Sequence, residues 1–134
     1  MTLVEFMPWL AGVGLAAFLV ATAGTDGSSR PGSWMLPATL SVLFLAWSVA
    51  AILVEGPVGF WREHTRNLWG NQIWFDLLLA IGIGWFLIVP QTKALGMRIY
   101  PWLLLILCTG CIGFLAMVSR LMYLREQCRE RGHK

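Results

Sequence analysis

Four long apolar stretches, separated by short polar segments, make up most of the 134-residue chain. They cover residues 3–23, 34–54, 73–89 and 100–123. Each approaches the roughly 20 residues that a helix needs to cross a hydrocarbon layer of about 30 Å. Backbone groups in lipid must satisfy their own hydrogen bonds, so apolar stretches of this length are expected to be helices. The pattern predicts an all-α protein, a four-helix transmembrane bundle that forms one integral membrane domain.

The composition supports a membrane protein with no separate soluble domain. Apolar residues make up 57% of the chain and charged residues 13%, against roughly 25% charged in a soluble domain. The net charge of +3 comes mainly from the basic C-terminal tail, residues 124–134. This charge indicates membrane topology and contact with anionic lipid, and it does not point to nucleic acid.

The positions of lysine and arginine predict an orientation. A four-span arrangement puts Arg62, Arg66, Arg120, Arg125, Arg129, Arg131 and Lys134 on one side, and Arg30, Lys93 and Arg98 on the other. The positive-inside rule then places both termini, the middle connection and the tail in the cytoplasm. Because the residues before the first stretch carry no positive charge, that stretch is interpreted as a retained helix and not as a signal peptide.

The middle connection, residues 57–71, is rich in aromatic residues and predicts a short helix at the membrane interface. Trp61, His64, Trp69 and Asn71 are candidate contacts for a lipid-like ligand or a partner, although simple anchoring is the favoured interpretation. His64 is also a candidate ligand for a pigment or haem. No second histidine lies in any predicted span, so the sequence requires no cofactor and predicts no metal site.

Cys108 and Cys111 form a C-x-x-C pair inside the fourth stretch. Relatives of vitamin K epoxide reductase also place such a pair in a four-helix bundle, but they need a second, shuttling pair in a loop, and the outer loops here lack cysteine. We expect two packing residues that are reduced and dispensable. With no nucleotide loop, paired carboxylates or nucleophile elbow, the sequence predicts no catalytic residue.

Asp76 is the one acidic residue clearly inside a predicted span. Ionisable groups in lipid are expensive and normally face a partner or a water-filled cavity. Helical spacing puts Gln72, Ala80 and Gly84 on the same face, where small residues allow close packing. This arrangement predicts a structural pairing inside the bundle, and a proton or cation relay is the alternative.

Arg120 is the predicted partner of Asp76. In four antiparallel spans the two residues lie at similar depths near the cytoplasmic boundary. If the last helix is rotated away, Gln72 and Arg66 are expected to donate to the carboxylate instead. Glu55, at the end of the second stretch, is the rival partner for Arg120.

Several short segments carry a resemblance to a known family. They are Asn-Leu-Trp-Gly-Asn-Gln-Ile-Trp-Phe-Asp at 67–76, Ala-Leu-Gly-Met at 94–97, Trp102, Gly110 and Leu-Met-Tyr-Leu-Arg-Glu at 121–126. Over residues 67–126 the chain resembles a family of small bacterial membrane proteins, cyanobacterial members among them, that has no established activity. The resemblance implies three or four spans in a bacterial inner or thylakoid membrane. Where the family tends to have Leu-Pro-Leu, this chain has Val118-Ser119-Arg120.

Two classes of function follow from these observations. The first is a non-enzymatic accessory or assembly subunit that lies in the bilayer and packs against other membrane subunits or a second copy. The second is a small oligomeric transporter, channel or lipophilic-ligand-binding protein that uses Asp76. A thiol redox enzyme built on Cys108 and Cys111 is a distant third.

Overall fold

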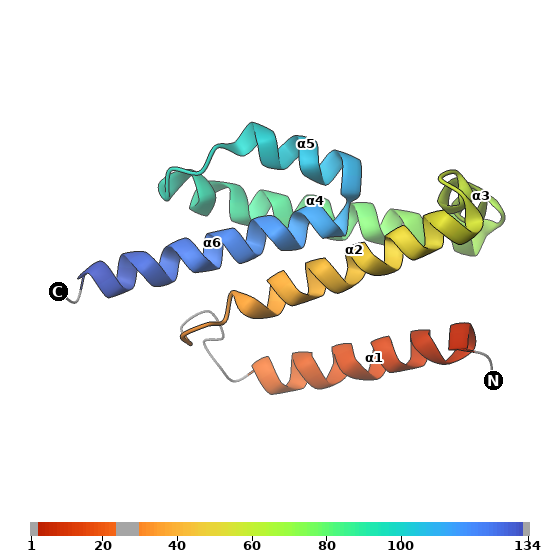
Figure 1. Cartoon of the computed structure of the whole chain (residues 1–134), viewed down its shortest axis with the longest axis horizontal. Coiled ribbons are helices and arrows are strands. Elements are labelled where there is room, and N and C mark those ends of the chain that lie inside the picture. Colours follow the sequence, from red (N-terminus) through yellow and green to blue (C-terminus); the bar gives the residue numbers. More distant parts are fainter. Residues whose placement is uncertain (1–2, 24–29, 133–134) are drawn as a thin grey trace. The chain divides into compact units, whose positions relative to one another are not determined.

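A computed structural model describes residues 3–23 and 30–132, with side chains from Glu5 onward. The chain divides into two compact units, Met1–Ser33 and Trp34–Lys134. The first unit contains helix α1 (Leu3–Thr22). The second contains α2 (Met35–Glu55), α3 (Gly59–Thr65), α4 (Leu68–Ala94), α5 (Ile99–Thr109) and α6 (Cys111–Gly132) (Figure 1). The described part of the chain is therefore all-helical, with turns between the helices.

Three helices, α1, α2 and α4, are long and apolar enough to cross a membrane. Helix α1 coincides with the first predicted stretch, and its Glu5 lies in the first turn, where a negative charge suits the helix dipole. Helix α2 ends at Glu55 because Gly56 adopts φ +82°, and its N–H donates to the carbonyl of Ile52. Helix α5, with 11 residues, is apolar but too short to cross a bilayer as an α-helix.

The fourth apolar stretch does not form the single helix that the pattern predicts, and this expectation is wrong. Gly110 separates α5 from α6, with φ +59° and ψ −124°, a conformation open essentially to glycine. The Gly110 N–H donates to the carbonyl of Ile106 at 2.7 Å. The Thr109 hydroxyl donates to the carbonyl of Leu105 and accepts from the N–H of Gly113. These bonds satisfy backbone groups that the break would otherwise leave unpaired.

Helix α5 folds back onto α6, so the two form a helical hairpin (Figure 1). The backbones approach so closely that a Cβ on Gly113 would lie 2.9 Å from the carbonyl oxygen of Leu105. In an unbroken helix these two residues would stand about two turns apart along the axis. The reversal at Gly110 thus sets the direction of α6.

Helix α6 is the central element of the second unit and contacts α2, α4 and α5. It runs antiparallel to α2, since Ser41 donates to the carbonyl of Ile112 at 3.0 Å and Ser119 donates to the carbonyl of Trp34 at 2.9 Å. The ring of Trp34 also packs edge-on against Tyr123, with centroids 5.3 Å apart. Polar side chains in this interface therefore join one helix to the other.

Helix α6 runs parallel to α4. Gly84 of α4 lies against the ring of Phe114, and farther along both helices Arg125 donates to the side chain of Gln91. Four spans joined by hairpins would instead make these two helices antiparallel. The return of the chain through α5 accounts for the difference.

The parallel course of α4 and α6 gives the second unit two distinct ends. The tail end holds the start of α2, the 95–98 link and the C-terminal part of α6. The corner end holds the end of α2, helix α3 and the start of α4. The middle connection and the basic tail, which the sequence pattern grouped on one side, thus lie at opposite ends.

The core of this unit is small and centred on α6. Met117, Leu121 and Ile106 are its buried apolar side chains. Thr92 is fully buried, and its hydroxyl donates to the carbonyl of Val89. Most other apolar side chains are exposed, as expected of helices whose outer surface meets lipid or a partner.

Candidate functional site

The α3–α4 corner is held by short-range polar contacts. The Asn67 side chain caps α4 by accepting the N–H of Gly70 at 2.8 Å. The Asn71 amide donates to the carbonyl of His64 at 3.0 Å. Gly70 lies against the α3 backbone, and a Cβ there would be 2.3 Å from the carbonyl oxygen of Glu63. The corner therefore depends on the absence of a side chain at Gly70.

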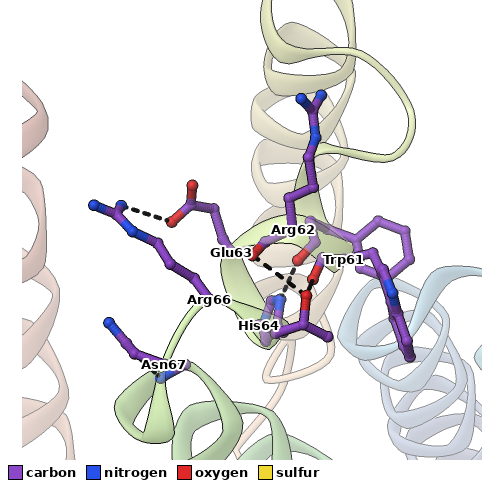
Figure 2. Close-up of polar contacts among 9 residues, drawn as sticks. Trp61, Arg62, Glu63, His64, Arg66 and Asn67 are labelled. Atoms are coloured by element: carbon purple, nitrogen blue, oxygen red, sulfur yellow. Dashed lines mark hydrogen bonds and ion pairs between the residues drawn. The ribbon is translucent and has the colours of Figure 1, made fainter.

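His64 forms contacts within this corner through both its backbone and its ring. Its Nδ1 lies 2.5 Å from the carbonyl oxygen of Phe60 (Figure 2). Because a carbonyl only accepts, Nδ1 is the protonated nitrogen in this contact. The imidazole packs edge-on against Trp74, with centroids 4.8 Å apart, and Phe60 packs on the same indole. His64 and Asn71 thus act first as structural residues.

The outer surface of the corner combines indole rings with charges. Trp61 is 53% exposed and Trp69 is 77% exposed. Arg66 and Glu63 form an exposed ion pair at 3.4 Å (Figure 2). Amphipathic rings beside paired charges suit the headgroup region of a bilayer. Of the four candidate contact residues, Trp61, Trp69 and Asn71 are exposed and His64 is half-buried, and the Asn71 amide is already bonded to the His64 carbonyl.

Asp76 lies on the outer face of α4. The inner face consists of half-buried residues, among which Gly70 and Trp74 contact α3 and Gly84 contacts α6, namely Gly70, Trp74, Leu77, Ile81, Gly84 and Ile88. The exposed residues Gln72, Asp76, Leu79, Ile83 and Phe86 form the opposite side, which we call the outer face of α4. The Gln72 amide donates to Oδ1 of Asp76 at 3.3 Å, whereas Arg66, the other donor expected if the last helix is rotated away, pairs with Glu63. The prediction that Asp76 shares the packed face of Gly84 is wrong.

Arg120 lies at the tail end and does not reach Asp76. It follows Ser119, which bonds the carbonyl of Trp34 at the start of α2, and its guanidinium lies 5.6 Å from the centre of the Tyr123 ring. Phe114 lies level with Gly84 of α4, and Arg125 lies level with Gln91. Arg120 lies between them on α6, so it is roughly 12 residues, or about 18 Å, from Asp76 along the axis of α4. Within residues 3–23 and 30–132 the two residues form no ion pair. The predicted pair is wrong because the break at Gly110 turns α6 around.

This geometry predicts that Asp76→Asn and Arg120→Gln are energetically independent. Their effects on unfolding free energy in detergent should add to within about 0.3–0.5 kcal/mol, the usual result for sites that are well separated. Asp76→Leu combined with Gln72→Leu is the matched control, since Gln72 donates to Asp76 and either change removes that bond. That pair should show a coupling of about 0.5 kcal/mol or more. A comparable coupling between Asp76 and Arg120 would contradict the structure.

Cys108 and Cys111 lie on either side of the Gly110 turn. Their placement in one continuous helix is therefore wrong, since Cys108 belongs to α5 and Cys111 begins α6. Both are free thiols; Cys108 is exposed and Cys111 half-buried. That serine at both positions leaves assembly intact stays a prediction.

The described residues contain no group of three or more His, Cys, Asp or Glu side chains arranged to hold a metal ion. Comparison of the chain with protein-family models, curated proteins and solved structures finds no match.

Proposed function

We propose that the protein is a non-enzymatic integral membrane subunit that packs against a larger membrane complex in an accessory or assembly role. The observation that supports this most is the position of Asp76, which lies on the outer face of α4. A pathway through a single copy would need this carboxylate to face the inside of the bundle. A contact with another protein needs it to face outward.

A comparison with the polar side chains of the core supports the same proposal. The core side chains find their hydrogen-bond partners within this chain, whereas Asp76 and Gln72 have only each other among the residues that the structure describes. Ser41 and Ser119 link α2 to α6, and Thr92 bonds its own helix. Gln72 and Asp76 instead bond only each other in the described contacts. An aspartate inside a membrane helix is costly, up to roughly 2.5–3.5 kcal/mol at the centre of the span on insertion scales, so this outward carboxylate favours a partner.

We further propose that the tail end faces the cytoplasm and that the corner lies on the other side of the membrane. Basic residues gather at the tail end, namely Lys93, Arg98, Arg120, Arg125, Arg129 and Arg131, with Glu126 and Glu130 among them. The corner holds two arginines, Arg62 and Arg66, against these six. The positive-inside rule therefore favours a cytoplasmic tail end. The resemblance to small bacterial membrane proteins makes the inner or thylakoid membrane the proposed location.

The same topology separates the chain termini. If α1, α2 and α4 each cross once, the chain makes three crossings before the α5–α6 hairpin. The hairpin enters and leaves on the same side. The N-terminus then lies across the membrane from the C-terminus, in place of the shared cytoplasmic location that four crossings predict.

Labelling with a membrane-impermeant maleimide tests this orientation. In a chain with its three native cysteines changed to serine, Thr65→Cys should react in intact cells, because α3 lies outside the cytoplasm. Glu130→Cys, the matched position on α6, should react only after the membrane is permeabilised. Equal labelling of the two positions, or the reverse order, would contradict the proposed topology.

The alternative function is a small oligomeric transporter or channel. The same outward position of Asp76 favours it if copies assemble around an axis, because a ring of carboxylates can line a cation pathway. Purification in mild detergent separates the two functions. Stoichiometric co-migration with larger subunits supports the accessory role. A symmetric homo-oligomer whose cation or proton flux in vesicles is lost in Asp76→Asn would replace it.

A further inference from the structure

We propose that the outer face of α4 docks a transmembrane helix of a different protein, and that this helix carries a lysine or arginine level with Asp76. The inference rests on the proposed accessory function and names the chemistry of the partner. The surface in question is the outer face defined above, with one polar pair near the corner end and apolar side chains beyond it. Leu79 and Ile83 are each 62% exposed, and Phe86 is 78% exposed.

The polar pair leaves the carboxylate incompletely satisfied. Gln72 provides one hydrogen bond at 3.3 Å. An ionised carboxylate has about four acceptor positions, so this one bond leaves most of them open. Asp76 also lies about 12 Å along α4 from Leu68, too far for its short side chain to return to the start of the helix. A cation at the same level would complete the site.

The described cations of this chain do not serve this purpose. Arg66 lies at the corner and pairs with Glu63 at 3.4 Å. Lys93 lies near the opposite end of α4, and Arg98 just beyond it. Helix α1 contains no basic residue, so it cannot neutralise the carboxylate. Arg62 donates to the backbone carbonyl of Glu55, so we assign the missing charge to another molecule.

A second copy of this chain is a poor source of that charge. In a twofold dimer the same surface meets itself, so a dimer through this face would bring Asp76 near Asp76 of the other copy at the same depth. Two carboxylates close together in lipid repel each other. A partner of different sequence, with a basic side chain at this level, is the occupant that the charge favours.

Synthetic transmembrane peptides provide the test. The full chain, labelled with a donor dye, is reconstituted in vesicles of phosphatidylcholine and phosphatidylglycerol. Four acceptor-labelled leucine–alanine helices are then added separately. The first has a single lysine level with Asp76, and the second and third have leucine or glutamate at that position. The fourth has its lysine in the opposite leaflet. Energy transfer should show that the matched lysine peptide binds at least tenfold more tightly than the other three.

Variants of the chain make the test specific. Asp76→Asn should reduce binding of the matched lysine peptide at least tenfold. Glu63→Gln, which removes a carboxylate from the corner, is the control and should bind as the wild type does. Asp76→Lys should reverse the preference and select the glutamate peptide. Circular dichroism of each variant in the same vesicles excludes loss of fold as the cause.

Several results would overturn the proposal. Equal binding of the lysine and leucine peptides, or unchanged binding by Asp76→Asn, removes the role of charge. Energy transfer between copies that depends on Asp76, without peptide binding, assigns this face to self-association. If a native complex with larger subunits survives Asp76→Asn, the docking site is wrong while the accessory function stands. If no such complex exists, the accessory function fails whatever the peptides show.

Discussion

Gly110→Ala is expected to destabilise the α5–α6 hairpin by about 1–3 kcal/mol, the usual cost of forcing a side chain into a backbone conformation that only glycine adopts freely. The residue has φ +59° and ψ −124°, and the whole return of the chain depends on this turn. The measurement is the free energy of unfolding in mild detergent, followed by circular dichroism during denaturant titration.

Gly82→Ala is the matched control, because Gly82 lies inside α4 with no neighbouring atom within 4 Å of an added Cβ. Alanine there should stabilise the protein by up to about 1 kcal/mol, because alanine loses less backbone conformational entropy than glycine when the chain folds into a helix. Equal effects at the two positions would mean that the turn at Gly110 is not required. A tail label moved across the membrane by Gly110→Ala would show that the stretch has straightened into one helix.

Gly70→Ala is expected to displace α3 from α4 and to cost about 1–3 kcal/mol, as overpacking typically does. The added Cβ would lie 2.3 Å from the carbonyl oxygen of Glu63, which is backbone and cannot rotate away. The shift should disrupt the ring contact between His64 and Trp74 and the bond from Asn71 to His64. Tryptophan fluorescence and unfolding free energy in detergent would both report it.

Gly84→Ala is the informative comparison for Gly70→Ala. A Cβ at Gly84 would also be crowded, at 2.5 Å, but the neighbour is the tip of the Phe114 ring. Phe114→Leu should therefore relieve much of the effect of Gly84→Ala. Rescue of Gly70→Ala by a side-chain substitution on α3, such as His64→Ala, would contradict the proposed backbone clash.

The first half of the fold follows closely from the hydropathy pattern, and the second half does not. Stretches 3–23 and 34–54 correspond to α1 and α2 almost to the residue. Stretch 73–89 is the middle of α4, which begins earlier because Asn67 caps it and continues past Pro90. The break at Gly110 could not be predicted locally, since glycine is frequent inside membrane helices. The contacts of α5 with α6 decide it.

The candidate site was predictable only where it depended on residues close together in sequence. The bond from Gln72 to Asp76 spans one helical turn and follows from spacing. The partner proposed on another helix, Arg120, depended on the direction of α6, which the turn at Gly110 reverses. The same reversal moves the basic tail away from the corner. One glycine therefore accounts for the wrong pair and for the separation of the basic tail from the corner.

The central position of α6 has a consequence for biosynthesis. The helix that contacts α2, α4 and α5 is also the last of these to leave the ribosome. Until it emerges, the hydroxyl of Ser41 and the carbonyl of Trp34 lack the partners that join α2 to the rest. The earlier helices are therefore expected to remain loosely associated in the membrane. The unit can pack fully only after the turn at Gly110 and helix α6 have been translated.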